Sequence, residues 1–556
     1  MIDSRPTLTV LALLSCAYLL AFIPPNLTGA KDPNMLGAFR QELPEYGSDE
    51  ATQFGTLTRM TRFEASPYKT LKNMLFYNQY FYGYTFFLSS MVVILPLRLI
   101  EHFFETSIPT SFYMMVLRQL SPIFMVTAIL LLVYLWTGFR SVARSVLLFI
   151  FLGSIPAVFL NNMFWHPDSL VTLFVVLTIF SLAKDELRFG RWFYLAAASS
   201  GLATGTKVIG LFFFLSVGVC LLLGFVHRRL DLKLVFKHGV LFVAVMAAAI
   251  VFSNPLLLLP SEAKAYYKVQ SFVAERNAWG WDRARDTGPM SWYLESGAGG
   301  APALRESFGF WWIYLLALLS SLFGVVYNRD KRIVYVIILT WILPISIYML
   351  YFVGSKGARY FIPVLLPFFS CIGATSGWRF DRRRGPQNRS TFIIGAASVV
   401  LCALQFAYYI PRDIGWYTRV LERESRSSSL HFYWELRDRF LSSLPSDKRL
   451  TVARDWKVYV PPSSNLLDNG TGNFDYDYVN VIKPDVILLT KGEIDLRSDP
   501  GAVQNSFPAD REQLLKSYDF YRNAKSNSIV GFNKLFETDF AVAFVGTKNE
   551  VRGPNH

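Results

Sequence analysis

Apolar runs separated by short polar segments occupy most of the first 410 residues of the chain. An α-helix needs about 20 apolar residues to cross the hydrocarbon core of a bilayer. Runs near this length lie at residues 7–23, 79–100, 111–136, 144–160, 169–183, 192–204, 208–225, 238–258, 310–327, 333–353, 359–377 and 391–410. The pattern predicts a polytopic α-helical membrane protein, with residues 1–410 as its transmembrane module.

The pattern changes in residues 411–556, where strand-like and helical segments alternate. Strand-like runs bounded by turn signals lie at residues 450–453, 486–489, 528–532 and 540–545, and helical stretches lie at about 416–444 and 510–522. A segment of this length can bury a core of its own. We therefore expect a small soluble α/β domain at residues 411–556.

The composition of the chain agrees with this division. Of its 556 residues, 52% are hydrophobic and only 17% are charged, against roughly 25% charged residues in soluble proteins. This excludes disordered and collagen-like classes. The four cysteines lie inside apolar runs, so an extramembrane disulfide framework is excluded as well; they are Cys16, Cys220, Cys371 and Cys402.

The formal net charge of +14 is concentrated in short loops. Residues 24–78, 259–309 and 411–556 each carry equal numbers of acidic and basic side chains, so the excess lies elsewhere. Most of it lies in the loops 140–144, 184–191, 228–237, 329–332 and 379–389. Short basic loops of this kind are typical of the cytoplasmic side of a membrane protein. A nucleic-acid partner is excluded, because it requires a contiguous basic patch on a folded domain.

Those loops predict the orientation of the helices by parity. With residues 140–144 and 184–191 in the cytoplasm, the connector 161–168 lies outside. The same count places residues 205–207 and 259–309 and the C-terminal domain outside, with the N-terminus inside. Residues 24–78 become the first outer loop and residues 259–309 the second long outer loop.

If the N-terminus and loop 140–144 both lie in the cytoplasm, the chain must cross the membrane an even number of times between them. The apolar runs before residue 140 exceed an even number by one, so one of them does not span or the N-terminus lies outside. Run 79–100 is the one expected not to span, because it opens with closely spaced tyrosines and phenylalanines and contains Pro96. Aromatic side chains of this density suit the bilayer interface. We predict about eleven spans and a juxtamembrane segment at residues 79–100.

Two adjacent carboxylates, Asp49 and Glu50, lie in the first outer loop. Adjacent side chains in an extended segment point apart, so the two are expected to have separate roles. One would take a proton from an acceptor hydroxyl, and the other would bind a metal or fix a neighbour. Tyr46 is a candidate for the acceptor or metal site. A solvated acidic turn is the alternative, and the sequence leaves it open.

The second outer connector ends in His166, Pro167 and Asp168, directly before an apolar run. An ionisable residue at the rim of a membrane helix is a functional candidate by default. Asp168 is also well placed to cap the helix that follows, and both roles are compatible. His166 is a candidate proton carrier, acceptor-site residue or metal ligand, although a lone histidine more often serves as a structural hydrogen-bonding residue.

Four basic residues lie near membrane boundaries on the predicted outer side, and they are Arg118, Lys207, Lys356 and Arg359. Arginine offers a fork and lysine a point charge to a phosphate, and polyprenyl phosphates carry their head groups at this depth. Each residue could instead extend passively to the interface. Their shared outer location opposes the positive-inside trend, so we favour binding of a donor phosphate.

In order and spacing, these features resemble the GT-C superfamily of integral-membrane glycosyltransferases. They are most similar to glycosyltransferase family 39, the protein O-mannosyltransferases and the lipid A aminoarabinose transferase. The matching pieces are Asp49-Glu50, Arg118, Asp168, GLATGTK at residues 201–207 and RYFIPVLLP at residues 359–367. The resemblance covers nearly all of residues 1–410 and implies a GT-C type fold for them.

The resemblance implies transfer of a sugar from a polyprenyl-phosphate donor on the outer face. The acceptor hydroxyl would belong to a lipid, a cell-wall glycan or a protein. It implies that Asp49 is the general base and that Asp168 assists acceptor or metal binding. It also implies that Arg118, Lys207 and Arg359 hold the donor phosphate.

Two departures from the family pattern matter. The segment 166–168 is not the DxD-type metal motif of the oligosaccharyltransferases, so dependence on a divalent cation such as Mg²⁺ or Mn²⁺ stays open. The 259–309 loop has no inserted sugar-binding module, which favours a bacterial-type enzyme of the plasma membrane.

A transporter or lipid flippase is the main alternative, because it too uses ionisable residues within the membrane. Transporters commonly show two related halves with broken helices at the midplane, and the sequence shows no such internal symmetry. A non-catalytic assembly subunit is a third reading. It would leave Asp49, Asp168 and the four outer cations without a common purpose.

Overall fold

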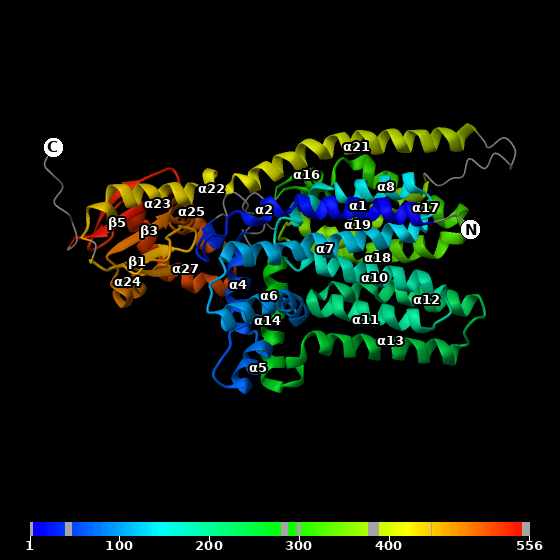
Figure 1. Ribbon diagram of the computed structural model, residues 1–556, viewed down its shortest axis with the longest axis horizontal. Helices are drawn as coiled ribbons and strands as arrows, with labels where there is room; N and C mark the ends of the chain where they lie inside the picture. Colours follow the sequence, from blue (N-terminus) through cyan, green and yellow to red (C-terminus); the bar gives the residue numbers. More distant parts are fainter. Residues whose placement is uncertain are drawn as a thin grey trace.

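The computed structural model describes residues 4–38, 47–279, 287–296, 302–375, 389–445 and 447–547. It consists of a long helical bundle and a small α/β domain at one end of that bundle (Figure 1). The described chain is mostly helical, with one small sheet confined to the C-terminal part. The predicted fold class, a polytopic α-helical membrane protein with a C-terminal α/β domain, is confirmed.

The bundle consists of helices that run side by side along its length (Figure 1). They are α1 (Arg5–Ala21), α2 (Ile23–Leu27), α7 (Thr110–Thr137), α8 (Val142–Gly153), α9 (Pro156–Asn161), α10 (Asp168–Asp185), α11 (Arg191–Thr206), α12 (Phe214–Val226), α13 (Leu232–Ser253), α17 (Trp311–Tyr327), α18 (Arg332–Phe352), α19 (Ile362–Ser370), α20 (Ile372–Thr375) and α21 (Arg389–Leu421). The 3-10 turns η1 (Val208–Phe213), η2 (Pro255–Leu258), η4 (Arg329–Lys331) and η5 (Ala358–Phe361) extend four of these segments.

Within the described residues, six segments are long and apolar enough to cross a membrane. These are Arg5–Leu27, Tyr84–Phe104, Thr110–Thr137, Val208–Val226, Leu232–Ser253 and Arg329–Phe352. Val142–Gly153, Trp311–Tyr327 and Ala358–Ser370 are shorter apolar helices. The prediction of about eleven spans requires shorter helices to cross as well, and Figure 1 shows them alongside the long ones.

Prolines explain why two predicted runs are divided. Pro156 is the first residue of α9, so the run 144–160 breaks between α8 and α9. Pro363 is the second residue of α19, which follows the 3-10 turn η5. A proline fits the first turn of a helix but interrupts its interior, because it lacks a backbone N–H. Each break leaves irregular backbone at the same end of the bundle.

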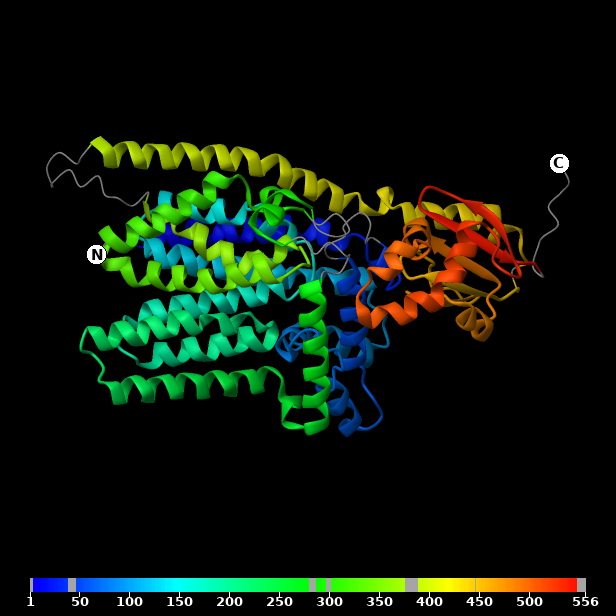
Figure 2. The same ribbon diagram turned by 180° about the vertical axis from the view of Figure 1, so that it is seen from behind.

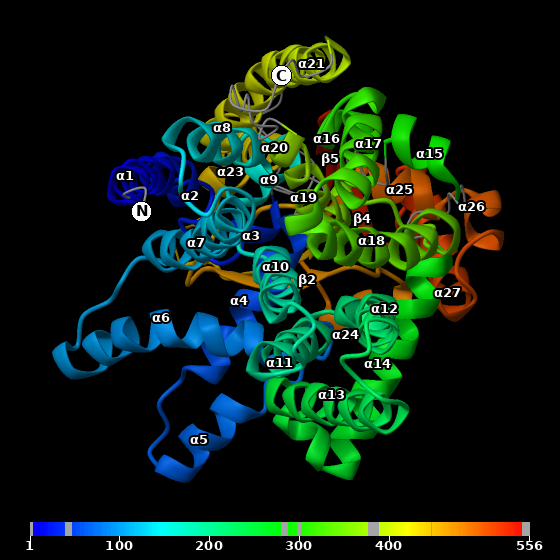
Figure 3. The same ribbon diagram turned by 90° about the vertical axis from the view of Figure 1, so that its right-hand side faces the viewer.

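Helix α6 (Tyr84–Phe104) lies across the bundle and not along it. Figure 1 shows it end-on, whereas Figure 3 shows it lengthwise beside bundle helices that are seen end-on. Helix α14 (Pro260–Trp279) also runs crosswise, on the same end of the bundle (Figures 1 and 2). Helix α6 is long and apolar enough to cross a membrane by length and composition alone, so the juxtamembrane role of residues 79–100 stays a prediction.

The other segments of the outer loops gather at this end. They are α3 (Met35–Ala38), α4 (Gly47–Met60), α5 (Pro67–Leu75), α15 (Pro289–Leu294) and α16 (Leu304–Phe308). Helix α4 packs against α6 through buried apolar residues that include Phe54, Leu57 and Phe87. The crosswise helices therefore form a layer between the bundle and the C-terminal domain.

The basic loops 140–144, 184–191, 228–237 and 329–332 gather at the opposite end of the bundle (Figure 1), and loop 379–389 lies almost wholly outside the described residues. Lys331 donates to the carbonyl oxygen of Leu135 at 2.8 Å. Arg229 donates to the carbonyl oxygen of Glu186 at 2.6 Å. These contacts join loops from distant parts of the chain, and the N-terminus lies at the same end (Figure 1). This grouping is what the parity argument requires, while the side of the membrane on which it lies stays a prediction.

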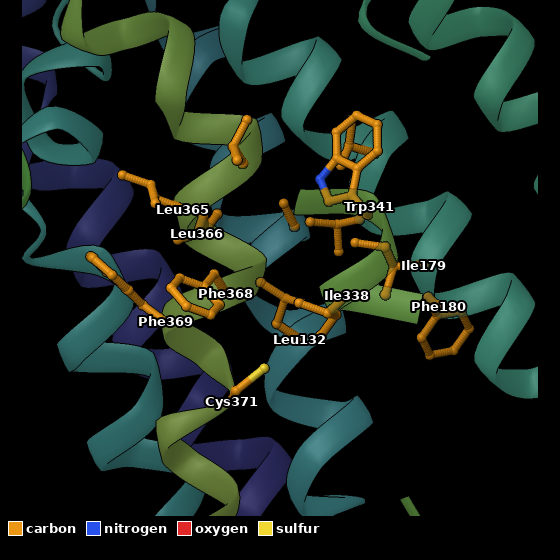
Figure 4. Packing of buried hydrophobic residues seen from close by; sticks show 14 of the residues in the cluster. Leu132, Ile179, Phe180, Ile338, Trp341, Leu365, Leu366, Phe368, Phe369 and Cys371 are labelled. Carbon is orange, nitrogen blue, oxygen red and sulfur yellow. The ribbon is translucent and has the colours of Figure 1, made fainter. Parts of the chain in front are cut away.

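Close packing of large apolar side chains fills the middle of the bundle. Leu132, Ile179, Ile338, Trp341 and Leu366 come from four different helices and are fully buried (Figure 4). The Trp341 ring stacks on Phe213 with ring centroids 4.1 Å apart. Because lipid chains are as apolar as these residues, van der Waals packing holds such helices together. The packed middle leaves the two ends as the places for chemistry.

The C-terminal domain has a five-stranded sheet with strand order β2-β1-β3-β5-β4. The strands are β1 (Leu450–Asp455), β2 (Leu466–Thr471), β3 (Val486–Thr490), β4 (Phe532–Glu537) and β5 (Ala541–Gly546). Strand β1 is parallel to β2 and β3, and β5 is antiparallel to β3 and β4. The remaining elements are η6 (Leu441–Ser443), α22 (Arg423–Arg426), α23 (Ser428–Arg439), α24 (Tyr476–Ile482), α25 (Lys491–Arg497), α26 (Pro500–Gln504) and α27 (Pro508–Lys525).

Two apolar layers cover the faces of this sheet. Val452 packs with Phe432 of α23 on one face, and its neighbour Ala453 packs with Phe520 of α27 on the other. This is the two-residue alternation of a strand that is buried on both faces. The domain continues from α21 (Figure 2) and contacts the first outer loop, where Tyr459 donates to Asp32 at 2.6 Å.

The structure corrects two sequence predictions in this domain. The run 528–532 is not a strand, because a turn with Gly531 at φ +82° precedes β4, which begins at Phe532. Strand β2 was not predicted, because its Asn469-Gly470 pair is typical of a turn and the strand is only partly buried. Helix α21 also continues unbroken through residue 411 to Leu421.

Candidate active site

Five ionisable side chains meet where the bundle joins the crosswise layer. We call Asp49, His166, Asp168, Lys207 and Arg359 the carboxylate cluster. Asp49 comes from the first turn of α4, and Asp168 is the first residue of α10. Lys207 directly follows α11, and Arg359 lies in the turn η5. Helix breaks at the end of the bundle thus bring together residues up to 310 positions apart in the sequence.

Asp49 is held through one of its two carboxylate oxygens. Its Oδ2 accepts a hydrogen bond from Nη2 of Arg359 at 3.0 Å. The same oxygen lies 3.2 Å from Nε2 of His166 and 3.3 Å from the hydroxyl of Tyr82. The side chain keeps 28% of its surface exposed. Asp49 is therefore oriented firmly and still reachable from outside the protein.

The surroundings of Asp49 favour its ionised form. Burial raises the pKa of its carboxyl, but Arg359 and His166 outweigh that effect and hold the pKa well below its usual range. Opposite charges within a few ångströms lower a carboxyl pKa in this way. Burial, together with the charge of Asp49, raises the pKa of Tyr82 well above its usual range, so the Tyr82 hydroxyl stays neutral.

Asp168 is enclosed by three basic groups. Its Oδ2 lies 2.6 Å from Nδ1 of His166 and 3.9 Å from Nε of Arg359, and its Oδ1 pairs with Nζ of Lys207. Only 2% of its side chain is exposed. The carboxylate makes no capping hydrogen bond to the start of α10, although it lies at the helix N-terminus, where negative charge is favourable.

His166 links the two carboxylates, because one ring nitrogen faces each of them. The ring is almost completely buried, and Tyr82 contacts its Nε2 at 2.9 Å. The arrangement fixes the ring between Asp49 and Asp168.

Glu50 has a different environment from its neighbour Asp49. It forms a bidentate pair with Arg118, at 2.9 Å to Nε and 2.6 Å to Nη2. Glu50 also accepts from the backbone N–H of Trp165 at 2.8 Å. Arg118 uses its remaining nitrogen for the carbonyl oxygens of Asn26 and Thr28. The pair is buried and anchors α4 to α7 and to the connector that carries His166.

The four predicted phosphate-binding residues therefore separate into two groups. Lys207 and Arg359 join the carboxylate cluster. Arg118 is bound to Glu50 and to backbone carbonyl oxygens. Lys356 pairs at 2.5 Å with Glu295, which belongs to the second long outer loop. Tyr46, the other predicted residue of the acceptor or metal site, lies outside the described residues.

Sequence reasoning missed two tyrosines of this site. Tyr82 contacts Asp49 and His166, and the ring of Tyr360 lies 5.1 Å from Nζ of Lys207. The aromatic density of residues 77–87 was interpreted only as a membrane interface. The position of Tyr360 beside Arg359 was an available signal, because aromatic rings attract nearby cations, and the Tyr360 ring does lie near Lys207 and Arg359.

A tight backbone contact fixes the turn that presents Lys207. The N–H of Gly83 donates to the carbonyl oxygen of Thr206 at 3.2 Å. A Cβ atom on Gly83 would lie 1.9 Å from the carbonyl oxygen of Gly205. Asn254 adds a hydrogen bond to that same oxygen at 2.9 Å. The small residues before Lys207 therefore allow close packing against the start of α6.

Two crystal structures of ArnT from Cupriavidus metallidurans are similar to the chain over its whole length. The complex with undecaprenyl phosphate has a TM-score of 0.51 and 10% sequence identity, over 98% of this chain and 99% of that chain. The apo structure has a TM-score of 0.50 and 12% identity, over 96% and 98%. The apo oligosaccharyltransferase of Archaeoglobus fulgidus gives a TM-score of 0.46 with 12% identity, over 98% and 75%. No protein-family model and no curated protein matches the sequence.

The near-complete coverage of both ArnT structures includes the bundle, the crosswise layer and the C-terminal domain. The protein has the GT-C fold. The fold that the sequence resemblance implied is thereby confirmed. The carboxylate cluster lies at the end of this GT-C bundle that faces the C-terminal domain.

The two carboxylates of the carboxylate cluster face basic side chains. Within the described residues, no group of three or more His, Cys, Asp or Glu side chains is arranged to hold a metal ion. Asp49 and Asp168 instead face the cationic groups of Arg359 and Lys207. Those cations can supply the positive charge that stabilises a phosphate.

Proposed function

We propose that the protein is a glycosyltransferase that moves a sugar from a polyprenyl-phosphate-linked donor to an acceptor hydroxyl. The reaction takes place on the extracytoplasmic face, in a bacterial plasma membrane whose cytoplasmic side carries the N-terminus. The acceptor is a lipid, a cell-wall glycan or a protein. The GT-C fold and the carboxylate cluster at the end of the bundle support this proposal.

The contrast between the two carboxylates carries the proposal. Asp49 is 28% exposed, whereas Asp168 is 2% exposed and enclosed by His166, Lys207 and Arg359. Within the described chain, all hydrogen bonds to Asp49 reach Oδ2, which leaves Oδ1 for an incoming hydroxyl. A general base must lie within hydrogen-bond reach of the proton that it takes. Asp49 meets this requirement and Asp168 does not.

The reaction is a single displacement. The acceptor oxygen attacks the anomeric carbon while its proton passes to Asp49. The bond between that carbon and the phosphate oxygen breaks, and its electron pair remains on the phosphate. A base on the side opposite to the leaving group implies inversion at the anomeric carbon, by the stereochemical logic known for glycoside hydrolysis.

Lys207 and Arg359 are the groups that hold the donor phosphate. Lys207 keeps 20% of its side chain exposed and Arg359 keeps 10%, so both reach the solvent side of the cluster. Their positive charges stabilise the charge that develops on the leaving phosphate. The ArnT structure with undecaprenyl phosphate supports a polyprenyl lipid as the donor class here.

Asp168, His166 and the Glu50–Arg118 pair have supporting roles in this proposal. Asp168 keeps Lys207 in place and faces His166. His166 in turn orients Asp49, and the Glu50–Arg118 pair fixes α4 relative to the connector of His166. Glu50 and Arg118 are positioning residues, because their polar atoms are committed to each other and to backbone groups.

The test uses protein in lipid nanodiscs and a panel of polyprenyl-phosphate sugars with short-chain hydroxyl acceptors. We expect turnover of one donor by the wild type. Asp49→Asn should lower turnover about 10²–10⁴-fold, the usual contribution of a general base, with donor binding largely intact. Asp438→Asn, on the exposed surface of the C-terminal domain, is the matched control and should behave as wild type.

Two results would contradict the proposal. Near-normal turnover by Asp49→Asn would exclude Asp49 as the base, although the protein could still be a transferase. Absence of both turnover and donor binding across the panel would favour a transporter or an assembly subunit.

A further inference from the structure

An apolar groove that contains none of the residues of the carboxylate cluster lies on the side of the bundle. It runs between α1, α8, α9 and α21 and has a volume of about 400 Å³. Its apolar wall includes Leu14, Phe149, Phe159, Phe406 and Ile410. This size falls within the range of small-molecule and lipid sites in proteins, about 300–1,000 Å³.

One acidic side chain lines this otherwise apolar groove. Asp413 is 7% exposed, and its buried Oδ1 accepts no hydrogen bond from any described residue. Burial raises the pKa of the Asp413 carboxyl to about 9, so its ionised form is stable here only beside a partner that carries positive charge or donates a hydrogen bond. A buried acceptor that lines a groove therefore indicates a ligand with a hydrogen-bond donor or a positive charge.

The other polar groups of the groove cannot satisfy Asp413, because their protons are committed. The hydroxyl of Tyr18 donates to the carbonyl oxygen of Gly153 at 2.7 Å, and that of Ser154 donates to the carbonyl oxygen of Phe151 at 3.1 Å. The hydroxyl of Tyr417 donates to the carbonyl oxygen of Ala21 at 3.0 Å. Asp413 is thus the one acceptor among the lining residues that still needs a donor.

The groove lies near the membrane boundary on the side of the carboxylate cluster. Trp416, one turn beyond Asp413 on α21, borders the same narrow gap in the packing as Arg359 of the carboxylate cluster. Tyr417 ties α21 to the end of α1. Tyrosine and tryptophan at this depth are typical of the level of lipid head groups. A lipid in the groove would place its head group near Asp413 and its chain along the apolar wall.

We propose that this groove is a binding site for a phospholipid with an ethanolamine head group, whose ammonium pairs with Asp413. A primary ammonium offers both positive charge and N–H donors to the carboxylate. A choline head group has the charge but no N–H donor. An anionic glycerol head group has no positive charge and would be repelled by the carboxylate.

The test measures lipid binding by native mass spectrometry of the full chain in detergent. The probes are dioleoyl lipids with ethanolamine, choline or glycerol head groups. We expect the wild type to bind the ethanolamine lipid at least about tenfold more tightly than the other two, which corresponds to about 1.4 kcal/mol. Asp413→Asn should remove most of this preference. The control Glu422→Gln, on the same chain segment but exposed and paired with Arg426, should retain it.

A melting curve without added lipid separates misfolding from loss of the site. Asp413→Asn should melt at about the same temperature as the wild type, because without lipid the buried acid is protonated at neutral pH and asparagine has nearly the same shape. Equal affinity of the wild type for the three head groups would overturn the proposal whether or not the variant folds. Displacement of the ethanolamine lipid by undecaprenyl phosphate, with equal affinity in wild type and Asp413→Asn, would instead assign the groove to a polyprenyl chain. Because the readout is lipid binding, its failure leaves the proposed transfer reaction untouched.

Discussion

The two ends of the helical bundle carry the same kinds of cation in opposite environments. At the end with the N-terminus, Arg229 is exposed and donates to the carbonyl oxygen of Glu186. At the other end, Arg359 is 8% exposed and contacts the carboxylates of Asp49 and Asp168. The number of basic residues in a loop therefore predicts on which side of the membrane the loop lies. A basic residue that is buried against carboxylates is instead a candidate for a functional role.

The strongest test of this contrast is a matched pair of arginine substitutions. Arg359→Gln removes a cation from Asp49 and from the proposed site of the donor phosphate, and we expect kcat/KM for the donor to fall about 10²–10³-fold, as when one charge-stabilising group is removed. Arg229→Gln at the other end should leave kcat/KM unchanged. Steady-state transfer assays on both variants decide the matter. Equal losses would mean that the two ends do not differ in function.

A second test separates catalysis from anchoring within the outer end. Arg118→Met leaves Glu50 buried without its partner, so the free energy of unfolding should fall by about 3–5 kcal/mol. The double variant Arg118→Met with Glu50→Met should recover much of this loss, because no unpaired charge remains. Denaturant unfolding in detergent measures both. A double variant that is as unstable as the single variant would exclude a mainly electrostatic role for the pair.

The acid side of the pH profile should respond to Arg359. The pKa of Asp49 is lower in the folded protein than in the unfolded chain. At any pH above the unfolded pKa, Asp49 is therefore ionised and its ion pair stabilises the fold. The charge and this stabilisation are lost only as pH falls through the lower folded pKa. We expect flat kcat/KM for the wild type between about pH 5 and 7, above the ordinary carboxyl pKa of about 4.

Arg359→Gln should move the acid limb upward by about one pH unit, because an adjacent opposite charge shifts a carboxyl pKa by roughly that amount or more. Arg229→Gln is the control, and its profile should coincide with that of the wild type. Identical profiles for Arg359→Gln and the wild type would show that Arg359 does not set the ionisation of Asp49.

The smallest effect is expected at the basic end. Lys331 donates to the carbonyl oxygen of Leu135 near the surface, and surface substitutions usually change stability by less than about 0.5 kcal/mol. Lys331→Gln should therefore unfold like the wild type and retain transfer activity. A large loss of activity would mean that the basic loops take part in function as well as in orientation.

Much of the fold could be predicted because its signals are local. Apolar runs give the bundle helices almost residue by residue, as in Thr110–Thr137 for the predicted run 111–136. The break at Pro156 and the edge strand Leu466–Thr471 were missed, because packing decides whether a proline or an Asn-Gly pair interrupts an element. The predicted strand at 528–532 begins before β4, because the residues of β4 show only a weak alternation between buried and exposed positions.

The candidate site could be predicted only in part, because sequence indicates residue types and membrane side but not partners. Asp49, His166, Asp168, Lys207 and Arg359 do converge. Arg118 had the same sequence signal as Arg359, yet Glu50 occupies its guanidinium. The sequence contains no local mark of that pairing, which depends on how α4 packs against α7. Asp413 was not singled out, because only the groove reveals that it lacks a partner.

The central claim is that the carboxylate cluster and the basic loops lie on opposite sides of the membrane, with the cluster outside. Single cysteines in a chain whose native cysteines are replaced by alanine test it most directly. Ala65→Cys lies in the exposed part of the first outer loop, and Arg188→Cys lies in an exposed basic loop. A membrane-impermeant maleimide applied to intact cells should label Ala65→Cys at once and Arg188→Cys only after permeabilisation. The reverse pattern would contradict the account, because the carboxylate cluster would then face the cytoplasm.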